Sequence, residues 1–85
     1  MAKKLYGARS YRGGYHGWFK VRAYLSGSGR KLASADVGAS FAHEAAVAFA
    51  KHFKLGDVFP GRHESPYTYS FGTSSGPRIW TTGPA

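Results

Sequence analysis

Residues 18–25 alternate between two kinds of side chain, and this alternation constrains the fold more than any other stretch of the chain. Successive side chains of a β-strand point to opposite faces, so a period of two predicts a strand. Its apolar face can pack on a core and consists of Phe19, Val21, Ala23 and Leu25. Its other face is aromatic and cationic and consists of Trp18, Lys20, Arg22 and Tyr24. Such a face suits a negatively charged partner that contains rings, which points to nucleic acid.

Signals for two further strands flank this run. Paired glycines end a short segment at residues 10–14, which predicts a strand that leads into a turn. Serine and glycine alternate at residues 26–29, which predicts a flexible hairpin loop. Residues 30–37 are then predicted to form the return strand, which ends at Gly38. Together these segments predict a three-stranded antiparallel sheet.

Residues 40–54 contain the clearest helix signal. The segment is rich in alanine, the best helix former. Ser40 is the predicted N-cap and Gly56 the predicted C-terminal stop. Large and small apolar residues recur every four positions and form one stripe, which consists of Phe41, Ala45, Phe49 and Phe53. We therefore expect the helix to lie on the apolar face of the sheet.

The last third of the chain changes character, because proline and glycine divide it into short pieces. Residues 67–71 alternate aromatic and small polar side chains, and residues 78–82 are predicted to pair with them. This segment is either a hairpin extension, an extra sheet edge or a partly ordered tail, and a hairpin would also be able to cover the aromatic face of residues 18–25. The predicted fold is α+β: a three-stranded antiparallel sheet packed against one α-helix, with a C-terminal β-hairpin or irregular extension. Residues 1–56 form the sheet and helix, and residues 57–85 extend the same domain.

The composition is strongly basic. The chain has 85 residues and a net charge of +8, from 12 Lys and Arg against 4 Asp and Glu. This excess favours a polyanionic partner: DNA, RNA, anionic lipid or an acidic protein surface. Cysteine is absent, which fits a reducing compartment. No stretch approaches the roughly 20 apolar residues of a membrane-spanning helix. We therefore expect an intracellular protein with no membrane partner, in the cytoplasm, or at the nucleoid or nucleus when bound to DNA.

Residues 10–56 resemble the GCC-box-binding (AP2) domain of plant transcription factors and phage homing endonucleases, and also the arm-binding domains of phage integrases. The resemblance rests on four segments: Tyr11-Arg12-Gly13, Trp18-Phe19-Lys20-Val21-Arg22-Ala23, Gly38 and Glu44-Ala45-Ala46-Val47-Ala48-Phe49. It implies a phage-type DNA-binding protein whose three-stranded sheet lies in the major groove. By position, it implies DNA contacts from Arg12, Trp18, Lys20, Arg22 and Arg30.

The leading hypothesis is a small protein that binds double-stranded DNA through this sheet face. Tyr24 joins the candidate residues by the alternation, and Lys31 joins them beside Arg30 at the hairpin. A two- or three-stranded ribbon fits the major groove, arginine pairs bidentately with guanine, and lysine neutralises phosphates. If about five cations meet phosphates, the log–log dependence of affinity on salt has a slope near −4 to −5.

An acidic protein surface and double-stranded RNA are the two alternative partners. The alternative function is a phage or mobile-element module, an inhibitor or adaptor, that docks on an acidic surface of a larger or host protein. Aromatic side chains are favoured as interface anchors, and those proposed for this role are Tyr67, Tyr69, Phe71 and Trp80. Double-stranded RNA ranks lowest, because residues 1–17 offer no N-terminal helix of the kind that its binding domain requires.

The sequence shows no pattern for catalysis, so we expect no enzyme, no catalytic residue and no cofactor. The four acidic residues form no paired-carboxylate pattern, and no Ser-His-acid arrangement can be identified. The four histidines follow no zinc-binding spacing and thiols are absent, so we expect no metal site.

Overall fold

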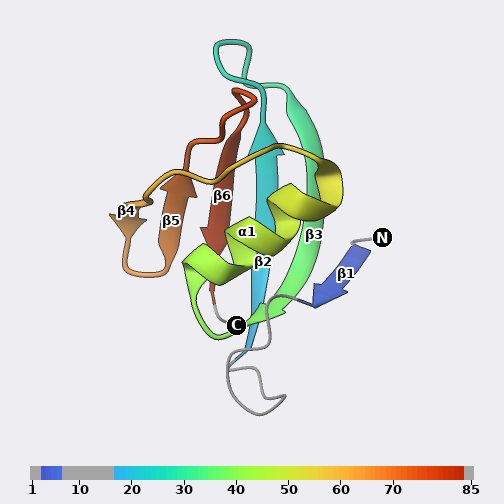
Figure 1. Ribbon diagram of the computed structural model, residues 1–85. Coiled ribbons are helices and arrows are strands. Elements are labelled where there is room, and N and C mark those ends of the chain that lie inside the picture. The colour runs from blue at the N-terminus through green and yellow to red at the C-terminus, as the bar shows by residue number, and fades with distance from the viewer. Residues whose placement is uncertain (1–2, 7–16, 84–85) are drawn as a thin grey trace.

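A single helix lies across one face of a six-stranded sheet (Figure 1). The computed structural model describes residues 3–6 and 17–83. The elements in chain order are β1 (Lys3–Tyr6), β2 (Gly17–Tyr24), β3 (Lys31–Ala39), α1 (Ala42–Phe53), β4 (Arg62–Ser65), β5 (Thr68–Phe71) and β6 (Arg78–Thr82). The strands lie in the order β1-β3-β2-β6-β5-β4. All neighbouring strands are antiparallel except β1, which runs parallel to β3.

The predicted hairpin at the centre of the sheet is confirmed. β2 and β3 pair in an antiparallel register that sets Phe19 opposite Val37 and Lys20 opposite Asp36. The loop closes because Gly27 and Gly29 adopt the left-handed region, with φ of 89° and 71°, where a side chain would be strained. A bulge after Ala23 then shifts the pairing at the loop end of the hairpin.

The core lies between α1 and the sheet, as the two apolar patterns predict. The helix buries one stripe, which consists of Ala45, Ala46, Phe49 and Ala50. The sheet buries alternate residues of its central strands, which are Phe19, Val21, Ala23, Ala35, Val37, Ala39, Phe71 and Ile79. Leu25 is an exception to the prediction: it lies past the end of β2, and its side chain is exposed.

The prediction of three strands is wrong, because the C-terminal segment continues the sheet and does not cover it. β6 occupies the position beside β2, where it pairs in antiparallel register from Lys20↔Thr82 to Tyr24↔Arg78. β5 and β4 follow it outward. Ile79 is fully buried on the side that faces α1, so β6 completes the same core as β2. Phe71 of β5 is buried in this core as well.

The N-terminal strand also differs from expectation. A strand was predicted at residues 10–14, which lie outside the described residues, and no strand was predicted before it. The described strand there is β1, which pairs with the far edge of β3 from Lys3↔Ala35 to Tyr6↔Gly38. The described part of the chain contains no helix of the length and apolar character that crossing a membrane requires.

The prediction that Ser40 caps the helix is wrong. The N-cap is Phe41, which has an extended backbone with φ −135° and ψ 152° and no side-chain cap. Its carbonyl oxygen accepts the first helical hydrogen bond, from the N–H of Ala45 at 3.1 Å. Glu44 instead reaches back, and its Oε1 accepts a 3.2 Å hydrogen bond from the Ser40 backbone N–H. The Glu44 carboxylate thus binds the backbone of the residue before the N-cap, while the Ser40 hydroxyl is buried without a partner.

Replacing Lys54 with glycine is expected to raise the free energy of unfolding by about 1 kcal/mol. Lys54 ends α1 in the left-handed conformation, with φ 57° and ψ 49°, and its N–H donates to the Ala50 carbonyl. A left-handed conformation costs a residue with a Cβ about that much, and glycine adopts it freely. Urea unfolding measures the change. Lys51→Gly is the matched control, because Lys51 lies inside the helix, and it is expected to lower stability by about 1 kcal/mol. A loss of stability in both variants would contradict the prediction.

Candidate nucleic-acid interface

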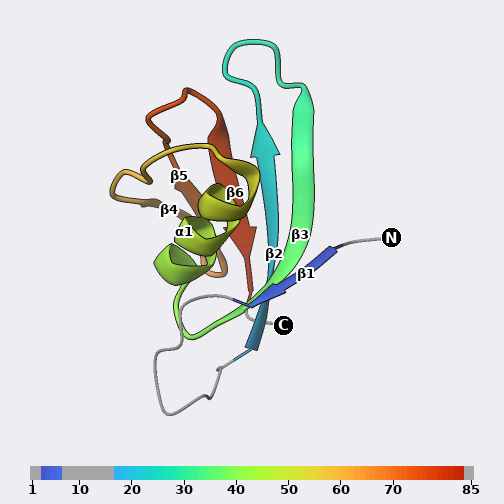
Figure 2. The same cartoon turned by 45° about the vertical axis from the view of Figure 1, so that its right-hand side comes forward.

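No described helix or strand covers the face of the sheet opposite α1, here called the open face, and this face carries cationic and aromatic side chains. Every described strand belongs to the one sheet, and the helix lies on its other side (Figure 2). The alternation along β2 sends Phe19, Val21 and Ala23 toward the helix. It therefore sends to the open face the four residues of the predicted binding pattern, which are Trp18, Lys20, Arg22 and Tyr24.

Cross-strand pairing arranges most of the open-face residues in three rows, and Trp18, paired with Gly38, lies beyond them. Residues paired across neighbouring strands share a face, so the register of the sheet identifies each row. The first row runs Ser34, Arg22, Trp80, Ser70, Arg62. The second runs Asp36, Lys20, Thr82, Thr68, and the third runs Lys31, Tyr24, Arg78. A cation occurs in each of these three rows, and the first row has arginines on both β2 and β4.

Within residues 17–83, positive charge is concentrated on this open face. It holds five cations against two carboxylates: Lys20, Arg22, Lys31, Arg62 and Arg78 against Asp36 and Glu64. The helix side holds two of each sign: Lys51 and Lys54 against Glu44 and Asp57. The positive potential of residues 17–83 is therefore directed mainly outward from the open face and from Arg30, which lies where the hairpin loop joins β3.

Hydroxyl groups hold two of the open-face arginines across strands. Arg22 Nη2 donates to Thr82 Oγ1 at 3.0 Å, and Arg22 Nε is buried without a hydrogen-bond partner. Arg78 Nη2 donates to Ser70 Oγ at 3.2 Å, and that hydroxyl in turn donates to a carboxylate oxygen of Glu64 at 2.6 Å. These contacts orient the guanidinium groups and leave further donors on each for a ligand.

Within the described residues, the ion pair found is Arg62 Nε with Glu64 Oε2, at 3.9 Å. The cations of β2, β3 and β6 thus have no carboxylate partner within 4.0 Å among those residues. A hollow between β2 and β3 is lined by several of these polar groups, which are Lys20, Arg22, Lys31, Ser34 and Asp36. Charged groups that lack an internal counter-ion are available to an anionic partner.

Six of the seven predicted DNA-contacting residues lie on one hairpin. Five of them belong to β2 and β3, and Arg30 lies in the loop between the two strands. Arg12 lies outside the described residues. Sequence reasoning missed Arg62 and Arg78 as members of the same face. For Arg78 the signal was present, because residues 78–82 alternate with the same period as residues 18–25.

The four aromatic residues proposed for a protein partner do not form one surface. Phe71 is in the core, only 2% exposed, and Tyr69 lies on the helix side of the sheet. Tyr67 is exposed in the turn between β4 and β5. Trp80 lies on the opposite, open face, in the row with Arg22.

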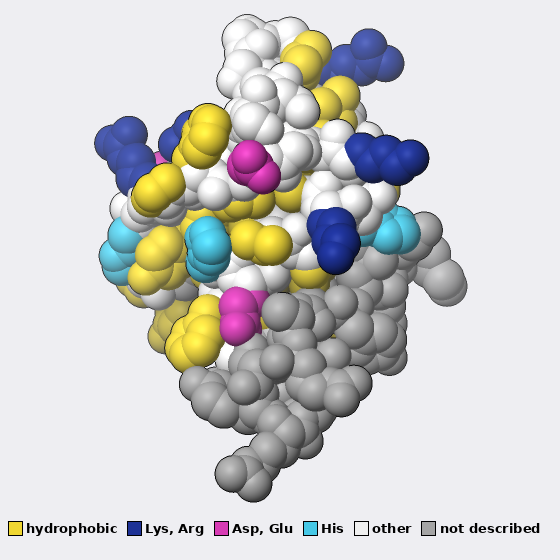
Figure 3. All heavy atoms as spheres, in the orientation of Figure 1, with side chains coloured by type: hydrophobic (Ala, Val, Ile, Leu, Met, Phe, Trp, Pro, Cys, Tyr) yellow, Lys and Arg dark blue, Asp and Glu magenta, His cyan; other side chains and the backbone are white. Residues whose placement is uncertain are grey.

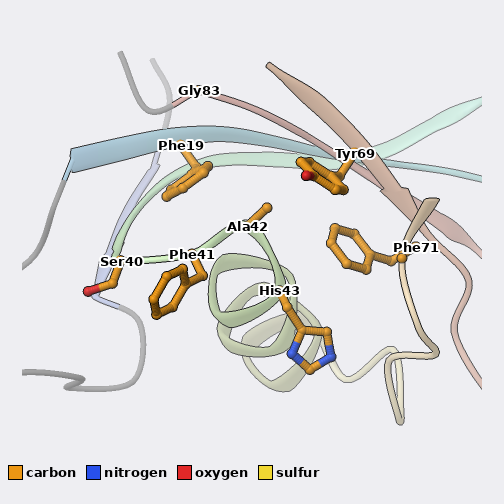
Figure 4. A pocket seen from close by; sticks show the side chains of 9 residues that line it. Phe19, Ser40, Phe41, Ala42, His43, Tyr69, Phe71 and Gly83 are labelled. Atoms are coloured by element: carbon orange, nitrogen blue, oxygen red, sulfur yellow. The ribbon is translucent and has the colours of Figure 1, made fainter. Parts of the chain in front are cut away.

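An apolar pocket of about 420 Å³ opens on the helix side, where hydrophobic and histidine side chains gather between α1 and β4–β5 (Figure 3). Phe41 and His43, at the start of α1, face Phe19, Tyr69 and Phe71 of the sheet across it (Figure 4). In the described part of the chain, no three His, Asp or Glu side chains gather as metal ligands would. The pocket therefore offers apolar contact and little polar chemistry.

Comparisons with family models, with curated proteins and with solved structures found no match to the chain. The resemblance to the GCC-box-binding family therefore stays a prediction.

Proposed function

We propose that this protein binds double-stranded DNA through the open face of its sheet, with the β2–β3 hairpin as the part that enters the major groove. The observation that carries the proposal is the placement of four cations on one two-stranded ribbon: Lys20, Arg22, Arg30 and Lys31. Arginine recognises guanine or phosphate bidentately, and lysine neutralises phosphate as a point charge.

The width of the sheet supports the choice of the hairpin. Six strands span five inter-strand spacings, or roughly 24 Å, whereas the major groove is about 12 Å wide and admits a two-stranded ribbon. The β2–β3 loop projects beyond the ends of the neighbouring strands (Figure 1). A ribbon that enters a groove by this end brings Arg30 and Lys31 in first and places Arg22 and Lys20 behind them.

A protein partner has weaker support than DNA. The aromatic residues proposed as its anchors are divided between the two faces, and Phe71 is buried. The apolar pocket is the better candidate for such a partner, but it lies on the side of the chain where charges of the two signs balance. An acidic surface is expected to prefer the open face, for the same electrostatic reason as DNA.

The experiment that tests the proposal is a salt titration of binding to a short blunt-ended duplex, measured by fluorescence anisotropy. Four ribbon cations that each neutralise one phosphate give a log–log slope near −3.6. Participation of Arg62 and Arg78 would make the slope steeper by roughly 0.9 for each contact. Absence of binding at low salt, or an affinity independent of salt, would refute the proposal.

A further inference from the structure

We infer that the open face also binds single-stranded nucleic acid, with an unpaired base stacked on the indole of Trp80. The inference rests on the proposed function in one respect: it uses the same basic face. It is centred on a different strand, because Trp80 lies on β6, outside the hairpin that enters the groove, although Arg22 and Tyr24 of that hairpin serve both ligands.

The first observation is that most of the sheet remains outside a groove that holds the hairpin. The strands β6, β5 and β4 lie to one side of β2 and add three spacings, or roughly 14 Å, to the width of the ribbon. This part of the open face still carries two arginines and a tryptophan: Arg62, Arg78 and Trp80. A basic and partly aromatic surface of this width is unsuited to a duplex groove and suited to an extended strand.

The second observation is the set of neighbours around Trp80. Its cross-strand partners are Arg22 on β2 and Ser70 on β5, and along its own strand the open-face neighbours are Arg78 and Thr82. All four are polar, so neither the cross-strand pairs nor the adjacent strand positions pack an apolar group against the indole. Its side chain is partly exposed on a face that no other described helix or strand covers.

The third observation concerns the arginines that flank the indole. Arg22 is held by Thr82 and Arg78 by Ser70, and neither has a carboxylate within 4.0 Å among residues 17–83. Each guanidinium is thus oriented beside Trp80 and keeps donors for a phosphate. Because a nucleotide has a phosphate on each side of its sugar, a base stacked on the indole sets its two phosphates near guanidinium groups.

These groups favour an unpaired base for a physical reason. In a duplex the faces of the bases are covered by their neighbours, so proteins reach only their edges. An aromatic side chain stacks on a base only where the base has been splayed from such a stack, and every base offers a face for this contact. Tyr24, the diagonal neighbour of Trp80 on β2, is within reach of the next base along the strand.

The test compares three dye-labelled probes by fluorescence anisotropy: oligothymidine, oligouridine and a blunt-ended duplex. The wild type is expected to bind at least one of the two single strands. Trp80→Thr removes the ring and keeps a side chain with high strand propensity. It is expected to weaken single-strand binding about tenfold, the contribution of one stacked base, with an unchanged salt slope and duplex affinity within about twofold. Trp80→Phe retains a ring and is expected to restore most of the affinity.

The outcomes separate this inference from the proposed function. Duplex binding without binding to either single strand would overturn the inference and leave the proposed function standing. Equal weakening of duplex and single-strand binding by Trp80→Thr, or no weakening of either, would also overturn it. A thermal unfolding curve shows whether Trp80→Thr is folded. If it is not, the comparison of Trp80→Thr with the wild type is replaced by quenching of the Trp80 indole fluorescence in a Trp18→Phe variant. Absence of quenching by an oligonucleotide that binds would then overturn the inference.

Discussion

Replacing Phe49 with alanine is expected to lower the free energy of unfolding by about 3–5 kcal/mol. Phe49 is fully buried on the inner face of α1, and its ring packs on that of Phe53 with 4.7 Å between centroids. Truncation deletes most of a large apolar side chain, so its buried contacts are lost. It also leaves a cavity in a core that is otherwise rich in alanine. Alanine neighbours have no alternative rotamers with which to fill the space.

The loss is large for this protein because small domains are marginally stable, with total unfolding free energies near the low end of about 5–15 kcal/mol. Urea unfolding followed by circular dichroism measures it. Val47→Ala is the matched control: Val47 lies on the exposed side of the same helix, and its truncation is expected to change stability by less than about 0.5 kcal/mol. A change of similar size in the two variants would show that α1 is not packed through Phe49.

The helix stripe illustrates how far local periodicity predicts packing. The four-residue repeat identified Phe49 and Ala45 as core residues, and both are fully buried. It also included Phe41, which is 52% exposed. The reason is that Phe41 is the N-cap, with an extended backbone, so the angular spacing of the helix does not apply to it. A period predicts a face only over residues that have helical dihedral angles.

Strand alternation has a similar limit. Along β2 it separated the two faces correctly, because the side-chain period of a strand is fixed by its backbone. It carried no information about which strand lies beside β2. That position is filled by β6, about 60 residues later in the chain, through pairs such as Arg22↔Trp80. Pairing over such a distance depends on the shared core with Ile79, which no local pattern specifies.

The candidate site contains residues that a local pattern places and residues that only the strand order places. The cations of the β2–β3 hairpin could be assigned to one face from local patterns. The alternation places the residues along the strand, and the glycine-containing loop identifies the hairpin. Arg78 and Trp80 follow the same alternation on β6, yet their membership of the open face depends on the strand order. The balance of charge on the helix side likewise emerges only when Asp57 and Lys54, from a loop and a helix end, are placed together.

Replacing both Lys20 and Arg22 with alanine is expected to weaken duplex binding about 100-fold at 0.1 M salt and to reduce the magnitude of the salt slope by nearly 2. Each phosphate contact contributes a slope of about 0.9, which corresponds to roughly tenfold in affinity at that salt concentration. The fold is expected to persist, because Lys20 is exposed and Arg22 makes one side-chain hydrogen bond, to Thr82. Removing Arg22 also removes a buried Nε that has no partner, which offsets part of that loss.

The matched control for this double variant is Lys51→Ala with Lys54→Ala, which removes the same charge from the helix side. If binding depended on net charge alone, the two double variants would weaken the complex equally. If the hairpin enters the groove, the control keeps nearly the full slope, since its charges lie across the sheet from the duplex and are screened over a Debye length of about 10 Å. Equal losses would therefore contradict an interface on the open face even though the chain binds DNA.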